Sequence, residues 1–463
     1  MSGKMSDFQK SISYNQLLKI VEKPLSTIHF VGVGGVSMYS LARFALHNGN
    51  RVSGSDREAS DRTFELCSLG AKISIGHNKD NVIDADIVVY SQAISSDNPE
   101  LVEAKRLHIP IVSRAEYLGA NMLKYKKCIG VSGSHGKSST VAMIDCIFKY
   151  AECNHTVLSG ADLTIGEPFR IGGDDLLLYE ACEYKDSFLR FLPSIAVALN
   201  LDLDHTDYFE DISSIKRSFI KALSKATEFA LINGDDGNLS QISKEIKAKV
   251  ITFGNGENNN YKYSLISFLD KGFSFNISRN GEYLGDFELH IPGSFNIYNA
   301  TAAIAVAIEC GIDVKIVAEA ISHYNGIARR LEFLGFRKGR EVYYDYAHHP
   351  TEIKAVIDAL RLSAQGPLTV VFKPHTYSRT RSFWEDFRSA LSGADYVILS
   401  DIYPAREEAI PDVSSTRLAE AIGERAKYCP DERIIESIDR DTRGRIVLMG
   451  AGDLEKIKRN ILK

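Results

Sequence analysis

The sequence predicts an α/β protein built from three successive α/β units. Three observations support this fold class. Short apolar runs alternate with helical patterns, glycine-containing turns separate them, and 463 residues are enough for about three domains. Because each connection between parallel strands needs a crossover, usually a helix, this alternation is typical of parallel sheets covered by helices.

The first unit is predicted to be a Rossmann-like N-terminal domain over residues 1–122. Its expected strands and its first helix are short and separated by turns. A polar, lysine-rich segment at 123–127 marks the boundary to the next unit. The strands are expected at residues 28–31, 51–56, 87–90 and 109–112, with a helix at 38–47.

The second and third units are predicted over residues 123–325 and 326–463. In the second unit α/β alternation is expected to continue to about residue 325, where an Asn-Gly pair and two arginines mark the boundary. The third unit is expected to be an α/β domain as well. The strands are expected at 127–132, 176–179 and 195–199 in the second unit, and at 342–345, 368–372, 396–400 and 446–450 in the third.

Composition and charge exclude several classes of protein. Hydrophobic residues make up 44% and charged residues 25%, and the formal net charge is −5, which argues against a protein that wraps nucleic acid. The N-terminus is too polar for a signal peptide, and no apolar run approaches the length of a membrane span. Seven scattered cysteines without a CxxC pair favour a reduced cytoplasmic location over disulfides or structural zinc.

A phosphate-binding loop is predicted between a strand and a helix of the second unit. The segment is GVSGSHGKSST at residues 130–140. Glycines allow backbone N–H groups to surround a phosphate, and the helix N-terminus adds its positive dipole end. Lys137 can reach the β- and γ-phosphates of ATP, and the Ser138 hydroxyl is placed to bind Mg²⁺. Val131 stands where the longer motif has glycine, so the match is to the GxxGK[ST] core; a glycine-rich turn with an incidental lysine is the alternative.

Acidic residues follow two later strands of the same unit. Glu180 and Glu183 follow one strand, and Asp202, Asp204 and His205 follow the next. In parallel sheets ligands bind at the carboxyl ends of the strands, so both clusters are expected to face the phosphate loop. Mg²⁺ prefers oxygen ligands, and a histidine completes such a site less commonly. The alternative is that these acids cap helices.

The first unit carries a second candidate nucleotide site. The segment 32–37, GVGGVS, joins a strand to a helix, and Asp56 follows Gly32 by twenty-four residues. This pattern resembles the dinucleotide fingerprint, in which a later acid binds ribose hydroxyls. Ser37 replaces the third glycine, which weakens an NAD interpretation, and the diphosphate of a UDP-sugar would suit the loop equally well. A tight turn without a ligand is the alternative.

Taken together, the motifs resemble the Mur ligases of peptidoglycan precursor synthesis, in order and spacing, from about residue 26 to residue 453. They are HFVGVGGVSM, GSHGKSST, LDLDHTDYF, PGSFNIYNATAA, ARRLEFLG, DYAHHPTEI, FKPHTYSRTRSFWEDF, DIYPARE and GAGD. The resemblance implies a three-domain Mur ligase architecture: a Rossmann-like domain for the UDP-sugar, a central P-loop ATPase domain, and a Rossmann-like C-terminal ligase domain.

The resemblance is strongest to the alanine-adding branch of the family. It implies that UDP-N-acetylmuramate, L-alanine and ATP with Mg²⁺ react through an acyl phosphate to give UDP-N-acetylmuramoyl-L-alanine, ADP and phosphate. A tripeptide-recycling Mur-type ligase is the alternative within the family. An ATP-hydrolysing switch and a nicotinamide oxidoreductase are the alternatives outside it. No nucleic-acid or membrane partner is expected, and the chain is expected to be a monomer or a homodimer.

The resemblance also implies roles for individual residues. The catalytic group is Lys137, Glu180, His205 and His348. The ATP-binding group is Gly133, Ser134, His135, Gly136, Lys137, Ser138, Ser139, Asn296, Asn299, Arg330 and Asp345. The substrate-binding group is Gly34, Asp56, His77, Ser91, Arg114, His349, His375 and Arg379. The metal ligands are Ser138, Glu180 and His205, with Glu183 as a neighbour.

At a few positions the sequence departs from the commonest pattern of the family. Three serines in the loop replace threonines, which conserves the hydroxyl chemistry. Phe295 stands where many members have a histidine, so no histidine role is expected there. Where relatives that add other amino acids carry a carbamylated lysine, the count from His205 reaches Ile220, with Lys221 next to it, and this modification is not expected.

Overall fold

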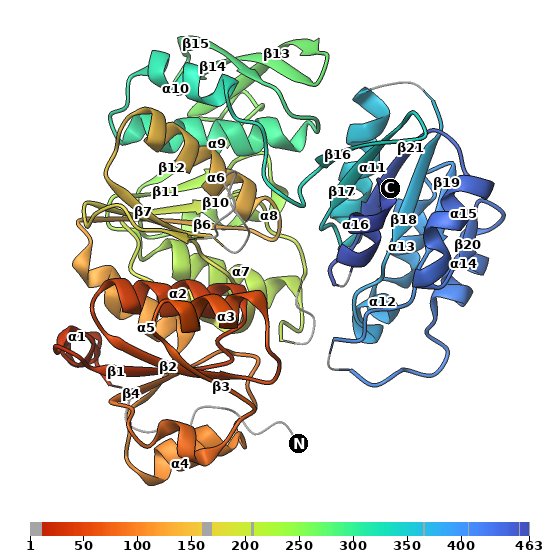
Figure 1. The fold of residues 1–463 in the computed structure, drawn as a ribbon. Coiled ribbons are helices and arrows are strands. Elements are labelled where there is room, and N and C mark those ends of the chain that lie inside the picture. The colour runs from red at the N-terminus through yellow and green to blue at the C-terminus, as the bar shows by residue number, and fades with distance from the viewer. Residues whose placement is uncertain are drawn as a thin grey trace. The chain divides into compact units, whose positions relative to one another are not determined.

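The structure is a computed structural model that describes residues 12–159, 169–204, 208–363, 366–405, 407–452 and 454–462. The chain forms two compact units, Met1–Val141 with Glu152–Thr252, and Ala142–Ala151 with Phe253–Lys463. His205, predicted as a metal ligand, lies outside the described residues. The ribbon in Figure 1 shows strands and helices alternating along the chain, as the α/β prediction requires.

Five parallel strands form the first sheet, in the order β3-β2-β1-β4-β5. The order reverses beside β1, which lies between β2 and β4, and such a switch point places a ligand crevice at the carboxyl ends of the strands. The loop after β1 leaves the sheet at this point and leads into α2. The elements are α1 (Tyr14–Glu22), β1 (Thr27–Val31), α2 (Val36–His47), β2 (Arg51–Asp56), α3 (Asp61–Ser68), β3 (Lys72–Ile75), β4 (Ile87–Tyr90), α4 (Pro99–Arg106), β5 (Ile111–Ser113) and α5 (Arg114–Asn121).

The middle part of the chain adds six strands to the first unit, in the order β11-β10-β6-β9-β7-β8. All pair in parallel except β8, which is antiparallel to β7. The central strand β6 is buried along most of its length and ends at the phosphate loop. The elements are β6 (Lys127–Ser132), α6 (Lys137–Tyr150), β7 (His155–Leu158), β8 (Phe169–Arg170), β9 (Leu176–Glu180), β10 (Ile195–Ala198), α7 (Ile212–Leu223), β11 (Phe229–Asn233) and α8 (Gly237–Ile242).

One hydrophobic core joins these two parts of the first unit. The rings of Phe44 on α2 and Phe169 on β8 meet edge to face at 6.4 Å between centroids. Tyr14 on α1 donates a hydrogen bond of 2.5 Å to the carbonyl of Arg190. Apolar burial on this scale is the main term that stabilises a fold. The glycine loop after β1 and the phosphate loop after β6 therefore belong to one packed body.

The expectation of α/β alternation up to residue 325 is wrong for residues 261–289. The end of β12 pairs in parallel with β13, and in the second unit β13, β14 and β15 pair antiparallel as two hairpins. Asn280 and Gly281, between β14 and β15, both have positive φ, the conformation of a tight type I′ hairpin turn. The elements are β12 (Val250–Gly254), β13 (Tyr261–Leu269), β14 (Gly272–Arg279), β15 (Glu282–Leu289), α9 (Phe295–Glu309) and α10 (Val314–Ser322).

Six strands form the last sheet, in the order β16-β17-β21-β18-β19-β20. Only β16 is antiparallel to its neighbour among the described pairs. The four strands expected in this region are confirmed to within two residues at either end. The elements are β16 (Glu332–Arg337), β17 (Arg340–Asp345), α11 (Pro350–Ser363), β18 (Leu368–Phe372), α12 (Tyr377–Ser382), α13 (Trp384–Leu391), β19 (Tyr396–Leu399), α14 (Ser415–Ile422), β20 (Ala426–Tyr428), α15 (Ile434–Asp441), β21 (Arg445–Met449) and α16 (Glu455–Ile461).

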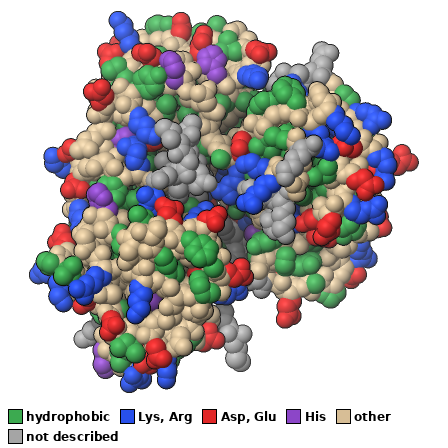
Figure 2. Space-filling model, in the orientation of Figure 1, with side chains coloured by type: hydrophobic (Ala, Val, Ile, Leu, Met, Phe, Trp, Pro, Cys, Tyr) green, Lys and Arg blue, Asp and Glu red, His purple; other side chains and the backbone are tan. Residues whose placement is uncertain are grey.

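The surface carries both signs of charge. Acidic and basic side chains are scattered over the face that Figure 2 shows. All seven cysteines have free thiols. Within the described ranges, no helix combines the length and the apolar character that crossing a membrane requires.

Candidate active site

The phosphate loop begins where β6 ends and closes at the start of α6. Gly133 and Gly136 have φ values of 138° and 83°, which favour glycine. A Cβ atom at Gly133 would also lie 3.1 Å from the Cβ of Leu199. Both glycines are therefore required by the backbone path, and the loop ends at Lys137, the first residue of α6.

Asn200, in the segment after β10, fixes the shape of this loop. Its side chain accepts a 2.8 Å hydrogen bond from the His135 N–H and donates one of 3.1 Å to the His135 carbonyl. Its backbone carbonyl accepts from the Ser134 N–H at 3.3 Å. Two hydrogen bonds to the backbone of one residue hold both flanking peptide groups in position. The loop is thus pre-organised.

Lys137 lies inside the site and is paired with Glu183. Its Nζ lies 3.2 Å from both carboxylate oxygens of Glu183, which is only 3% exposed. The same nitrogen donates to the backbone carbonyls of Gly133 and Ser134. Burial alone would lower the pKa of Lys137, but the negative charges of Glu183 and nearby acids raise it well above its usual value. The lysine therefore carries its charge throughout the physiological pH range.

The described candidates for magnesium binding are Ser138 and Glu180. Glu180 ends β9, beside β6 in the sheet, and one of its carboxylate oxygens accepts from Ser159 Oγ at 2.9 Å. The Ser138 hydroxyl, on the first turn of α6, makes no hydrogen bond with a described residue. A hydroxyl and a carboxylate are the oxygen donors that Mg²⁺ prefers, so these residues fit the ion. No group of three or more His, Cys, Asp or Glu suited to a metal occurs within the described ranges.

The glycine loop after β1 is held by the acid at the end of β2. The Gly34 N–H donates a 2.8 Å hydrogen bond to Asp56 Oδ2, and a Cβ at Gly34 would lie 3.0 Å from the same oxygen. The helix α2 starts directly after this loop, with Gly35 as its N-cap. The positive end of the α2 dipole and its free N–H groups favour an anion at this position. Asp56 therefore shapes the loop whatever else it binds.

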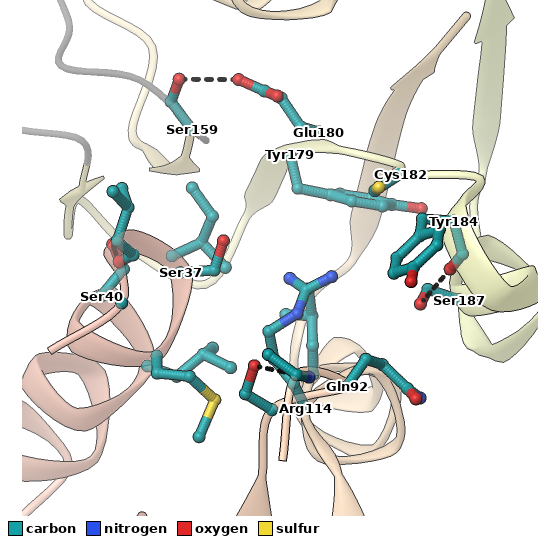
Figure 3. Close-up of a pocket in the computed structure, with 18 of the residues that line it drawn as sticks. Ser37, Ser40, Gln92, Arg114, Ser159, Tyr179, Glu180, Cys182, Tyr184 and Ser187 are labelled. Carbon is teal, nitrogen blue, oxygen red and sulfur yellow. Dashed lines mark hydrogen bonds between the residues drawn. The ribbon is translucent and has the colours of Figure 1, made fainter. Parts of the chain in front are cut away.

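A single cavity of about 390 Å³ connects this helix start with the phosphate loop. Figure 3 shows that its walls come from α2, from the residues after β4 and β5, and from β9 with the segment that follows it. The Lys137 side chain also lines it. The polar and charged lining residues are Ser37, Ser40, Ser91, Gln92, Arg114, Lys137, Ser159, Tyr179, Glu180, Cys182, Tyr184 and Ser187.

Arg114, the first residue of α5, points its guanidinium into this cavity (Figure 3). It makes no hydrogen bond or ion pair with any described residue, although the negative charge of Glu180 acts on it from a distance. Burial removes water from the guanidinium of Arg114 and so lowers its pKa below the usual value. A desolvated cation of this kind is costly until an anion pairs with it.

The predicted adenine-contacting asparagines lie in the second unit. Asn296 and Asn299, on the first turns of α9, are each 5% exposed. Asn296 donates to the Pro292 carbonyl at 2.7 Å, and Asn299 donates to Asn296 Oδ1 at 3.1 Å. These hydrogen bonds fix the start of α9 relative to the preceding loop.

Arg330 and Asp345, predicted to contact phosphate and ribose, lie close together. Asp345 ends β17 and accepts hydrogen bonds of 2.7 Å from the backbone N–H groups of Leu331 and Ala347. Burial, the largest influence, raises the pKa of Asp345 to about 6, although Arg330 acts in the opposite direction. The Arg330 guanidinium also lies 3.4 Å from Glu352 and over the ring of Tyr346. A cation is thus held at the carboxyl end of β17.

The predicted substrate histidines cluster at the carboxyl ends of β17 and β18. His348 and His375 have ring centroids 5.8 Å apart, and His375 stacks on Tyr403. His349 is 5% exposed, and its Nδ1 accepts a hydrogen bond from the Thr351 N–H. A buried ring bonded to a nearby backbone group suits a residue that holds its own loop in place. Near Arg379, the backbone of Thr376 has φ 62°, a strained conformation for a β-branched residue.

Within the first unit, one cavity brings together Lys137, Glu180, Ser91 and Arg114, whereas Gly34 and Asp56 lie outside its lining. His77 lies at the end of β3 and is not part of the cavity lining. The sequence patterns did not indicate a role for Asn200 or Gln92, and Glu183 was expected only as a neighbour of the metal ligands. Asn200 directly follows a buried strand next to β6, and this position was the available signal.

Three family models match the chain in succession. Residues 27–126 match "Mur ligase family, catalytic domain", residues 131–307 match "Mur ligase middle domain", and residues 329–452 match "Mur ligase, glutamate ligase domain". Together they cover most of the chain.

Curated relatives match over nearly the full length. A UDP-N-acetylmuramate–L-alanine ligase of Alkaliphilus metalliredigens is 41% identical over 95% of this chain and 98% of its own length. One of Acetivibrio thermocellus is 41% identical over 94% of this chain and 95% of its own length.

Solved structures share the architecture. A UDP-N-acetylmuramate–alanine ligase of Thermotoga maritima superposes with a TM-score of 0.79 and 26% identity, covering 94% of this chain and 98% of that one. A murein peptide ligase of Psychrobacter arcticus has a TM-score of 0.71 at 22% identity over 94% of this chain and 98% of its own, which shows the shared fold alone.

Proposed function

The chain belongs to the Mur ligase family, and from that premise we propose that it joins L-alanine to the carboxylate of UDP-N-acetylmuramate at the expense of ATP. Its products are UDP-N-acetylmuramoyl-L-alanine, ADP and phosphate, a step in peptidoglycan precursor synthesis. Two relatives that are 41% identical over nearly the whole chain are named UDP-N-acetylmuramate–L-alanine ligase, and their similarity supports this proposal.

The observation that carries the proposal is the shared cavity of the first unit. The start of α2 suits the diphosphate of one nucleotide, whereas Lys137 and the phosphate loop suit the triphosphate of another. An ATPase switch needs only the second of these. A cavity lined by both supports a reaction in which one bound substrate attacks the γ-phosphate of the other.

The order of the strands gives the proposed direction of the UDP-sugar. With the diphosphate at α2, Asp56 on β2 lies on one side of the switch point, and Ser91 and Arg114 after β4 and β5 lie on the other. Ribose-binding acids follow the second strand of such folds, so the uridine belongs on the β2 side. The sugar and its carboxylate then extend toward Arg114 and Lys137, where an unpaired cation is available.

In the first chemical step, an oxygen of the sugar carboxylate forms a bond to the γ-phosphorus, and the bond to the bridging oxygen of ADP breaks. Two anions must approach each other, so positive charge has to surround the transferred phosphoryl group. Lys137, the loop N–H groups and Arg114 supply it in this chain. In the second step the neutral amine of L-alanine attacks the acyl carbon, phosphate leaves with the electrons of the broken C–O bond, and the amine loses a proton.

Ser138, Glu180 and His205 are the proposed ligands of a Mg²⁺ ion. When bound, the ion neutralises phosphate charge and polarises the phosphoryl oxygens. In the second unit we propose Asn296, Asn299, Arg330 and Asp345 as ATP contacts, and His348, His349, His375 and Arg379 as contacts for the amino acid. The buried environment of His349 supports a role in holding its loop more than direct contact.

The decisive assay incubates the protein with UDP-N-acetylmuramate, ATP, Mg²⁺ and a panel of acceptors, and follows UDP-linked products by mass spectrometry. We expect a product with L-alanine and little with the tripeptide L-alanyl-γ-D-glutamyl-meso-diaminopimelate, the acceptor of a recycling ligase. Phosphate release without any acceptor, and without a new UDP-linked species, would instead indicate a nucleotide-hydrolysing switch. The proposed site of action is the cytoplasm, as a monomer or a homodimer.

A further inference from the structure

A buried carboxylate in the first unit takes no part in the proposed chemistry. Glu100, near the start of α4, is 0% exposed. Its oxygens lie 2.6 Å from Ser55 Oγ, 3.1 Å from His77 Nδ1 and 2.5 Å from Asn81 Nδ2. Burial would raise the pKa of Glu100, but His29, whose Nε2 lies 3.8 Å away, and the hydrogen bonds from Ser55 and Asn81 outweigh it and lower the pKa to about 2. The carboxylate is therefore ionised and can only accept hydrogen bonds.

The hydrogen-bond inventory around Glu100 fixes the proton of His77. Ser55 has one hydroxyl proton, and its 2.6 Å contact with Glu100 uses that proton. His77 Nδ1 lies 3.0 Å from Ser55 Oγ and 3.1 Å from Glu100. Both neighbours can only accept from it, so Nδ1 carries the proton. In a neutral imidazole the other nitrogen, Nε2, is then an acceptor.

Nε2 of His77 is available to a ligand. It makes no hydrogen bond with a described residue, and the side chain is 16% exposed. The loop that carries it is tied down by Asn81, which bonds both Glu100 and the Gly76 carbonyl. Glu100 thus holds the ring and also the loop that presents it.

His77 lies on the uridine side of the proposed UDP-sugar site. It follows β3, which pairs with β2, and the Gly76 N–H donates to the carbonyl of Asp56 at 2.7 Å. With the diphosphate at the start of α2 and the ribose toward the end of β2, the base extends toward β3.

We propose that Glu100 is a positioning residue that holds His77 in its Nδ1–H form, so that Nε2 accepts a hydrogen bond from N3–H of uracil. The site thereby selects uridine over cytidine diphosphates. Uracil carries a proton on N3, whereas cytosine presents a lone pair there, which would face the lone pair of Nε2. The proposal rests on the proposed function in that the nucleotide is taken to be a uridine diphosphate.

The first test needs no variant. Nitrogen NMR of protein labelled in its histidines, at pH 8 where an ordinary imidazole is neutral, distinguishes the two tautomers and the imidazolium ion. Comparison with a His77→Gln protein assigns the signals. We expect the Nδ1–H form of His77, with a shift of the Nε2 signal when UDP is added. The Nε2–H form would overturn the proposal.

The second test compares UDP with CDP by calorimetry. We expect wild-type protein to bind UDP at least about tenfold more tightly than CDP. UDP gains one hydrogen bond to Nε2 of His77, whereas the lone pair on cytosine N3 is repelled there. In Glu100→Gln the amide can donate as well as accept, so the preference should fall toward equality and the NMR signature of the single tautomer should be lost. Glu103→Gln removes the same charge from another position on α4, where Glu103 pairs with Arg106, and should keep the preference.

The outcomes separate this proposal from the proposed function. Equal affinity of the wild type for UDP and CDP refutes the role of Glu100 and His77 while leaving the ligase activity standing. If neither nucleotide binds, the uridine diphosphate site itself is refuted, and the selectivity proposal with it. If Glu100→Gln does not fold, the wild-type comparison and the tautomer of His77 still decide the proposal.

Discussion

Lys137 and Glu183 form an ion pair inside the candidate active site, with the ammonium nitrogen 3.2 Å from each carboxylate oxygen. Lys137 is the residue that the phosphate loop offers to ATP, so Glu183 holds that charge in place before the nucleotide arrives. Lys137 lines the same cavity as Glu180 and the helix start that suits a diphosphate, and Glu183 lies just behind it.

We predict that Lys137→Ala abolishes ligation and also lowers stability. Removing one partner of a buried pair leaves the other charge uncompensated, which costs about 3–5 kcal/mol. The double variant Lys137→Ala with Glu183→Gln should recover much of the melting temperature but none of the activity. Calorimetry with UDP-N-acetylmuramate should still show binding by the double variant. A double variant that ligates would contradict the assignment of Lys137.

We predict that Arg114→Met weakens the UDP-sugar and stabilises the free protein. A charge-assisted contact is worth about 1.5–3 kcal/mol, so KM for the UDP-sugar should rise roughly tenfold to a hundredfold, with a smaller change in KM for ATP. Because the guanidinium is desolvated without a partner, the apolar replacement should raise the melting temperature of the free protein. Arg190→Met, at an exposed surface position, is the matched control. Unchanged kinetics together with a lower melting temperature would give Arg114 a structural role.

Much of the fold was predictable because glycine loops and buried parallel strands have strong local signals. β6 and the loop after it were predicted to the residue, since the strand is apolar and Gly133 and Gly136 must adopt positive φ. β3 was missed because it is a short edge strand with little burial. The hairpins β13 to β15 were missed because their alternation is irregular, with a bulge in each pairing.

The candidate site was less predictable than the fold, because its contacts join residues far apart in the sequence. Glu100 lies in the charged segment PELVEAKR, which resembles the exposed face of a helix. Its burial becomes visible only through His29, Ser55 and His77, which come from other strands and loops. Likewise, no local pattern indicates that Gly35 and Lys137 line one cavity.

We predict that Asp345 makes stability fall with rising pH. Its pKa is raised to about 6, mainly by burial, with Arg330 opposing and Glu352 adding to the shift. Between about pH 4 and 6 the unfolded chain has released this proton while the folded chain retains it. The contribution of Asp345 to the free energy of unfolding is therefore complete below about pH 4 and is lost as the pH rises to about 6. The loss is on the order of 3 kcal/mol. Scanning calorimetry should show a flatter pH dependence of the melting temperature in Asp345→Asn, and an unchanged slope would contradict the shifted pKa.

We predict that His205→Ala lowers kcat more than it raises KM for ATP. A metal ligand matters most when charge redistributes in the transition state, so the loss should be roughly a hundredfold or more. Mn²⁺ accepts imidazole ligands more readily than Mg²⁺, so the difference in kcat between His205→Ala and the wild type should be smaller with Mn²⁺. Melting temperature and kcat are measured on the same preparation. Near-normal turnover with reduced thermal stability would remove His205 from the metal site.

Transfer of a heavy oxygen isotope tests the ligase mechanism most directly. UDP-N-acetylmuramate labelled with the isotope in its carboxylate is incubated with the protein, ATP, Mg²⁺ and L-alanine, and the released phosphate is analysed by mass spectrometry. If the carboxylate attacks the γ-phosphate, one labelled oxygen leaves with each phosphate, and phosphate release depends on the UDP-sugar. Unlabelled phosphate released alongside UDP-N-acetylmuramoyl-L-alanine, or phosphate released at the same rate without the UDP-sugar, would contradict the acyl-phosphate mechanism.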